Sequence, residues 1–210
     1  MYLTNKERVL KVVLKLFSKP SQAPSYFCHL ITGKSPLELR LPWWSYDAIN
    51  YLKNLKFESC FEWGSGGSTL FLATLCKQVT AVENDSKWYK KLESEIRENQ
   101  LKNISLLHRD LNLSNSANFR KSVYFNSLNK KYDLIVIDGE DHFGPESSWS
   151  ARTACFEKAQ DFINPDGLIV VDDSWRYPEI KKLSNASSSF SFESLGPARR
   201  GVTSTDIYLY

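Results

Sequence analysis

The stretch Phe57-Glu-Ser-Cys-Phe-Glu62-Trp-Gly64-Ser-Gly-Gly-Ser-Thr69 decides the fold. It predicts a short apolar strand that ends near Glu62, a glycine-rich turn, and an apolar helix from Leu70 to Cys76. Glycines let the backbone turn tightly and approach a ligand, and the first N–H groups of the helix face the same space. Dinucleotide-binding folds carry G-x-G-x-x-G here, but Thr69 stands at the third glycine position. Because a carboxylate at Glu62 would repel a pyrophosphate, the turn suits a cationic ligand.

A second carboxylate stands at the end of the next predicted strand. Residues 78–83 alternate between polar and apolar side chains, and Glu83 lies 19 residues after Gly64. In nucleotide-binding α/β folds, an acidic side chain at about this spacing accepts hydrogen bonds from ribose hydroxyls. Charged acceptors make the stronger hydrogen bonds, which favours this role. The alternative is a solvated glutamate at a strand end.

Three further acidic residues follow apolar segments. Residues 104–107, 132–137 and 168–171 are predicted strands, and each is followed by an aspartate: Asp110, Asp138 and Asp172. Strands that alternate with helices predict a doubly wound, Rossmann-like α/β sheet that is mostly parallel. The last two predicted strands, near 190–193 and 205–209, have no helix between them, so one strand near the C-terminus is antiparallel. Ligands of open α/β sheets bind at the carboxyl ends of the strands, so this row of carboxylates favours a binding site.

Four motifs together resemble the class I S-adenosylmethionine-dependent methyltransferases. They are F-E-W-G-S-G-G-S-T at 61–69, V-E-N-D at 82–85, I-D-G-E-D-H at 137–142 and L-I-V-V-D-D-S-W at 168–175. The resemblance covers about residues 42–210. It implies one methyltransferase domain over 42–210 with a seven-stranded sheet, preceded by a basic helix and an irregular extension over 1–41.

The cofactor that the resemblance implies is S-adenosyl-L-methionine. Glu62 would face its α-ammonium, Glu83 its ribose and Asp110 its adenine amino group. Asp138 would line the same site. The methionine part would lie on the glycine turn, whose residues in this role are Gly64, Ser65, Gly66 and Ser68.

Methyl transfer to an oxygen needs a group that removes the acceptor's proton. His142, which titrates near neutral pH, and Asp138 are the candidate catalytic residues. Alternatively, Mg²⁺ could bind Asp138, Asp172 and Asp173, as in the catechol-type methyltransferases that the strand ends resemble. This chain departs from that family because Asp173 stands where an amide is preferred and there is no obvious lysine beside the fourth strand.

The candidate acceptor residues are Trp175, Arg199 and Arg200. The turn at 196–201 joins the last two strands and is expected on the cofactor side of the sheet. Arginine forks suit a carboxylate or phosphate, so we expect O-methylation of a small polar or anionic acceptor. Solvated loop arginines are the alternative. Two other function classes stay open: a non-catalytic cofactor-binding protein of the same fold, and an NAD-dependent oxidoreductase, which the missing glycine disfavours.

Composition limits the partners and the compartment. The formal charge of +3 is too small to predict nucleic-acid binding. The four cysteines form no C-x-x-C pair, which predicts reduced thiols in an intracellular, cytoplasmic protein. The sequence contains no apolar run of about 18 residues, so it predicts no membrane span. The oligomeric state stays open.

The N-terminal region predicts an amphipathic basic helix over residues 5–18. Residues 1–56 hold nine basic and three acidic side chains. Such a helix could lie on anionic lipid or on a partner, but we favour one that packs its apolar face on the domain and leaves its lysines in solvent. Residues 19–45, rich in proline and serine, predict an irregular segment, and the polar residues 112–131 an insertion or a loosely held helix.

Overall fold

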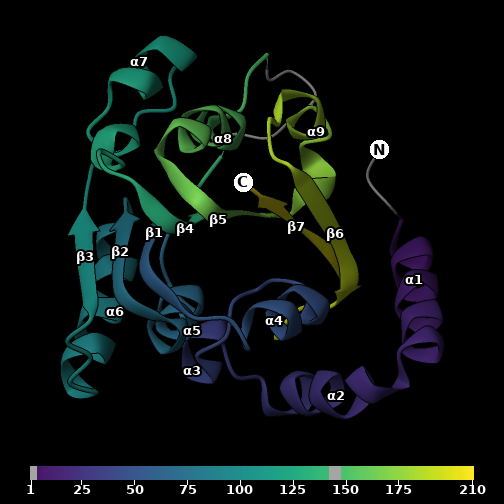
Figure 1. The fold of residues 1–210 in the computed structure, drawn as a ribbon. Coiled ribbons are helices and arrows are strands. Elements are labelled where there is room, and N and C mark those ends of the chain that lie inside the picture. Colours follow the sequence, from purple (N-terminus) through teal and green to yellow (C-terminus); the bar gives the residue numbers. More distant parts are fainter. Residues whose placement is uncertain (1–3, 142–147) are drawn as a thin grey trace.

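A computed structural model describes residues 4–141 and 148–210 of the chain. Its centre is a seven-stranded sheet in the order β3-β2-β1-β4-β5-β7-β6 (Figure 1). The first five strands pair in parallel, whereas β7 is antiparallel to both β5 and β6. The predicted α/β sheet with one antiparallel strand near the C-terminus is therefore confirmed. The strands are β1 (Phe57–Trp63), β2 (Cys76–Glu83), β3 (Ile104–His108), β4 (Tyr132–Ile137), β5 (Ile163–Asp172), β6 (Ser188–Leu195) and β7 (Val202–Leu209).

Helices cover both faces of the sheet (Figure 1). Neighbouring residues of β4 show the division, because side chains alternate along a strand. Ile135 faces the core shared with Phe119 and Phe156, while Val136 faces the core shared with Leu52 and Leu72. The helices of the first face are α7 (Ser116–Lys121) and α8 (Ala151–Phe162), with η2 (Phe125–Ser127) and α9 (Ile180–Leu183). Those of the second are α3 (Pro36–Leu39), α4 (Tyr46–Leu52), α5 (Gly67–Leu75) and α6 (Ser86–Glu98).

Residues 19–45 are largely helical, so the prediction of an irregular segment was wrong. They form η1 (Pro20–Gln22), α2 (Ala23–Thr32) and the short α3. Proline is compatible with a helix at its first turn, where the missing N–H has no intrahelical partner anyway. Pro36 opens α3 in this way, and Ser35 and Glu38 form a reciprocal capping box around it.

Residues 112–131 were also predicted wrongly, because part of this segment belongs to the core. Phe119, Tyr124 and Leu128 are at most 1% exposed and pack with β1 and β4. The many asparagines and serines of the segment cap helices instead, as Asn115 caps α7. A few buried aromatic residues therefore outweigh a polar composition.

The N-terminal helix α1 (Asn5–Ser18) forms as predicted, but it packs on the domain with only one side of its apolar face. Its apolar side chains Val9, Leu10, Val13, Leu14 and Phe17 are between 40% and 80% exposed. The face toward β6 and β7 carries Lys15, which pairs with Glu193 at 3.0 Å, together with the partly buried Val12 and Leu16. The expectation of a packed apolar face and a solvated lysine face is therefore wrong for most of this helix.

β5 begins earlier than the strand predicted at 168–171. Residues 164–167 lie inside it, where the register against β4 shifts. Among the described residues, α8 begins at Ala151, with Ser150 as its N-cap. Within 4–141 and 148–210, no helix is long and apolar enough to cross a membrane.

Gly67, the first residue of α5, fixes the segment before β1 against the glycine turn. A Cβ at this position would lie 2.3 Å from the carbonyl oxygens of both Pro36 and Leu41. Only glycine permits this approach of two backbone segments. The turn that follows β1 therefore depends on residues 36–41.

We expect Gly67→Ala to lower the free energy of unfolding by about 1–3 kcal/mol, because the new methyl group must displace backbone atoms. Urea denaturation measures the difference. Gly201→Ala is the matched control, since its Cβ meets nothing within 4 Å. Equal stability of the two variants would contradict the close approach.

Candidate active site

The glycine turn lies where β1, β2 and β4 end. Gly64 donates its N–H to the Val82 carbonyl at 3.0 Å and has a φ of +93°. A Cβ on Gly64 would meet the Asp138 backbone at 2.9 Å, so only glycine lets the turn lie against the end of β4. Trp88 of α6 donates from Nε1 to the Ser65 carbonyl at 2.7 Å and braces the turn from outside.

Glu62 is a fully buried carboxyl group beneath this turn. Its Oε2 accepts a hydrogen bond from Thr69 Oγ1 at 2.6 Å, while Oε1 has no partner among the described residues. Burial, with Asp138 and Glu83 adding to it, raises the pKa of Glu62 to about 8, although the Ser68 and Thr69 hydroxyls lower it. A buried carboxylate oxygen without a donor is unfavourable, and a cationic ligand would relieve it.

Glu83 stands across the turn from Glu62, and its orientation is fixed by three donors. Its Oε1 accepts from the N–H groups of Asn84 and Asp85, both at 2.8 Å, and its Oε2 accepts from Ser65 Oγ at 2.7 Å. The side chain is therefore held next to the glycine turn, as expected for a ligand-binding carboxylate. Asp110 is exposed and lies two residues beyond His108, the residue of β3 that stands opposite Glu83 in the sheet register.

The ends of β4 and β5 are joined by Arg152, a residue that sequence reasoning missed. Its guanidinium donates to the carbonyl oxygens of Gly139 at 2.8 Å, Asp172 at 3.0 Å and Asp138 at 3.1 Å, and to Asp138 Oδ1 at 3.2 Å. Asp138 Oδ2 accepts from Trp44 Nε1 at 3.2 Å. Burial raises the pKa of Asp138, and Arg152 opposes this.

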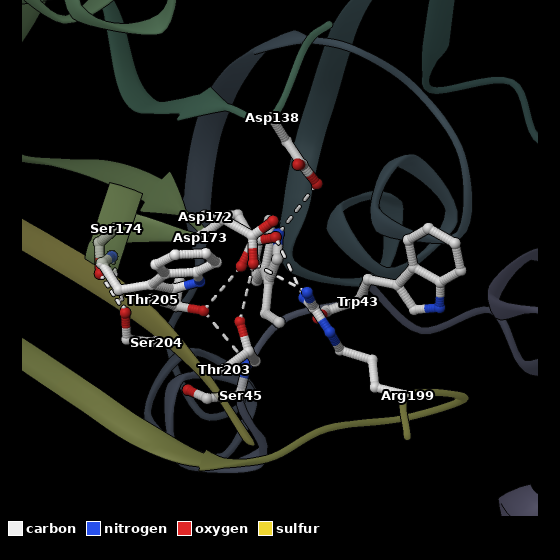
Figure 2. A network of polar contacts seen from close by, with 12 residues as sticks. Trp43, Ser45, Asp138, Asp172, Asp173, Ser174, Arg199, Thr203, Ser204 and Thr205 are labelled. Atoms are coloured by element: carbon white, nitrogen blue, oxygen red, sulfur yellow. Dashed lines mark hydrogen bonds and ion pairs between the residues drawn. The ribbon is translucent and has the colours of Figure 1, made fainter. Parts of the chain in front are cut away.

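Asp172 and Asp173 form a second buried group with Arg199 (Figure 2). Arg199 Nη2 donates to Asp173 Oδ1 at 2.8 Å, and Nη1 lies 3.6 Å from Asp172 Oδ2. Thr205 and Thr203 donate their hydroxyls to Asp172 and Asp173, each at 3.0 Å. Burial raises the pKa of Asp172. The pKa of Asp173 is lowered overall: burial raises it, but Arg199 and Arg176 outweigh that effect.

These contacts do not support the predicted Mg²⁺ site at Asp138, Asp172 and Asp173. Guanidinium groups of Arg152, Arg176 and Arg199 already supply the positive charge that these carboxylates need. Within the described parts of the chain, no group of three or more His, Cys, Asp or Glu side chains is arranged to hold a metal.

The remaining predicted residues lie in or around the space beyond the carboxyl ends of the strands, here called the crevice. His142 lies outside the described residues. Trp175 follows β5 in η3 (Ser174–Arg176); its ring is 48% exposed, and the Arg176 guanidinium lies 5.1 Å from its centroid. Arg200 is exposed beside it, and both line a pocket of about 450 Å³. A larger hollow of about 670 Å³ lies at the amino ends of β1 and β2, away from these groups.

Comparison with known proteins shows to which family the sequence is similar. The model of a family described as a methyltransferase domain matches residues 61–174, which contain the glycine turn and the carboxyl ends of β1 to β5. A search of curated proteins finds no match.

Solved structures match the fold at low identity. An O-methyltransferase from Bacillus cereus in complex with S-adenosylhomocysteine has a TM-score of 0.59 at 14% identity, covering 95% of this chain and 98% of that one. A methyltransferase from Pyrococcus furiosus has a TM-score of 0.54 at 16% identity, with 78% and 80% covered. An rRNA methylase from Streptococcus thermophilus has a TM-score of 0.52 at 14% identity, with 84% and 97% covered.

The raised pKa of Glu62 predicts how stability depends on pH. Between about pH 4.5, its ordinary value, and about 8, the folded protein holds a proton on Glu62 that the unfolded chain has lost. The free energy of unfolding therefore falls as pH rises through this window, by about 1.4 kcal/mol per pH unit for one such group.

Glu62→Gln removes this contribution, so we expect the variant to gain stability over the wild type as pH rises. Urea unfolding at several pH values across the window measures the gain. Glu58→Gln, with a carboxylate that is 72% exposed, is the control and should follow the wild type. Parallel pH profiles for Glu62→Gln and the wild type would rule out a buried, protonated Glu62.

Proposed function

We propose that this protein methylates an oxygen of a small, negatively charged acceptor. The premise is that the chain belongs to the family of methyltransferase domains described above and is a class I S-adenosylmethionine-dependent methyltransferase. The observation that carries the cofactor part of the proposal is the buried Glu62 side chain, whose Oε1 has no donor among the described residues and lies under a glycine turn. The cofactor's α-ammonium would donate a charged hydrogen bond to this oxygen. When bound, S-adenosylmethionine supplies an electrophilic methyl group on a sulfonium.

The rest of the cofactor fits the groups around the turn. Glu83 is oriented by the N–H groups of Asn84 and Asp85, and its carboxylate suits two vicinal ribose hydroxyls. Asp110 is exposed one strand further along the sheet and would reach the adenine amino group. Backbone and hydroxyl groups of the turn would hold the methionine part: Gly64, Ser65, Gly66 and Ser68.

The proton of the acceptor needs a base, and the contacts of Asp138 distinguish between the two candidates. Both oxygens of Asp138 already accept hydrogen bonds, one from Arg152 and one from Trp44. Because both oxygens are already engaged, this carboxylate is suited to positioning the acceptor. We therefore assign proton removal to His142 and positioning to Asp138; the role of His142 stays a sequence prediction.

The acceptor side of the crevice is cationic. Arg199 is engaged with Asp173 and with the Trp43 carbonyl, so it supports the crevice wall. Arg200 and Trp175 are exposed next to it and are the groups that we assign to the acceptor. The neighbour from Bacillus cereus is an O-methyltransferase, which supports oxygen as the nucleophile. Because rRNA methylases share this fold, an RNA acceptor is the competing possibility.

We expect Glu83→Ala to weaken the binding of S-adenosylhomocysteine by about 1.5–3 kcal/mol, the range for a hydrogen bond to a charged group. That corresponds to roughly a 10- to 150-fold higher Kd in calorimetry. Circular dichroism checks that the fold persists, since Glu83 also orders the turn through Ser65. Glu98→Ala, on the exposed side of α6, is the control. An unchanged Kd for Glu83→Ala would refute the ribose assignment.

A further inference from the structure

The pocket of about 450 Å³ joins the N-terminal helix to the carboxyl edge of the sheet. Its walls come from α1, from η3 after β5, and from the turn between β6 and β7. Thr203 and Arg199 belong both to this pocket and to the group around Asp173. The pocket therefore borders the group around Asp173, beside the crevice in which we place methyl transfer.

Five cationic side chains line this pocket: Arg8, Lys11, Arg176, Arg199 and Arg200. Arg176 and Arg199 are paired with Asp173. The acidic residue of the lining, Glu193, is paired with Lys15. Arg8, Lys11 and Arg200 make no ion pair with a carboxylate in the described chain. Five cationic side chains and the single carboxylate of Glu193, which attracts Lys11 as well as Lys15, thus leave an excess of positive charge around this pocket.

This arrangement is unfavourable for the protein alone. α1 turns its basic side toward an arginine-containing turn and leaves apolar side chains such as Leu10 and Phe17 in solvent. Repulsion between like charges, together with this exposure, weakens the docking of the helix. A ligand with negative charge between these cationic side chains would replace their mutual repulsion by attraction.

The shape and chemistry of the pocket indicate which anion it suits. Exposed Trp175 offers a flat apolar face, and the Arg176 guanidinium lies beside its ring. Arg8 and Arg200 offer planar forks, each able to bind two oxygens of one anion, and Lys11 offers a point charge. Three cations match a phosphate monoester, which carries nearly two negative charges near neutral pH.

We propose that Arg8 and Lys11 of α1, together with Arg200, bind a phosphate group of the methyl acceptor. The proposal rests on the proposed function and names its substrate class: a small phosphorylated molecule whose hydroxyl lies toward Asp138 and whose phosphate lies under α1. It also makes α1 part of the acceptor site, although the predicted division of the chain set residues 1–41 apart.

The test measures the binding of inorganic pyrophosphate to the full chain by calorimetry, with S-adenosylhomocysteine present. We expect Arg8→Ala/Lys11→Ala and Arg200→Ala each to raise the Kd for pyrophosphate about tenfold or more, and Arg8→Lys/Lys11→Arg to restore part of the affinity. Lys6→Ala, on the same helix but outside the pocket, is the control and should bind like the wild type. The Kd for S-adenosylhomocysteine should be the same in all variants.

Absence of pyrophosphate binding, or an equal Kd in the double variant, would overturn the proposal. Two further arms address other sources of phosphate. Tighter binding to a short single-stranded RNA than to pyrophosphate, with a steep salt dependence, would overturn it in favour of a nucleic acid. Binding to phosphatidic acid vesicles without binding to pyrophosphate would overturn it in favour of a membrane surface. If the wild type does not bind S-adenosylhomocysteine, the cofactor assignment is refuted instead. Failure of the phosphate proposal and failure of the proposed function are therefore distinguishable.

Discussion

The carboxyl edge of this sheet depends on the neutralisation of buried negative charge by arginine. Arg152 reaches from α8 to the ends of β4 and β5 and donates to three backbone carbonyl groups and one carboxylate. Its removal would leave the Asp138 carboxylate without its ion-pair partner. Loss of one partner of a buried pair costs far more than loss of one partner of an exposed pair. The positions of the two strand ends, and of the loops that follow them, therefore depend on one side chain.

The same crevice is left incomplete at both ends, with opposite sign. At the β1 end, Glu62 is buried with an oxygen that lacks a donor in the described chain, so this end favours a cation. At the β6–β7 end, the arginines exceed the carboxylates they neutralise, so it favours an anion. A cationic cofactor and an anionic acceptor would be drawn to different ends, which separates their binding sites by charge alone.

The glycine turn, the acidic strand ends and the alternation of strands with helices could be predicted, because each follows from local pattern: alternating side chains, glycine spacing and the polarity of a strand's last residue. Arg152 could not, because it lies on a helix with no distinguishing neighbours, and its partners are backbone carbonyls far away in sequence. The orientation of α1 could not be predicted either. Periodicity identifies two faces of a helix, but the burial of Phe119 and the outward position of Phe17 depend on tertiary contacts.

The position of β7 has a consequence for the order in which the protein folds. It follows β6 along the chain yet lies between β5 and β6, so β6 cannot join the sheet until residues 202–209 are available. During synthesis, β1 to β5 can assemble first and leave the apolar edge of β5 open to wrong pairing. Thr205 and Thr203, which bond to Asp172 and Asp173, arrive with the same strand. Closure of the sheet and maturation of the crevice are thus a single late event.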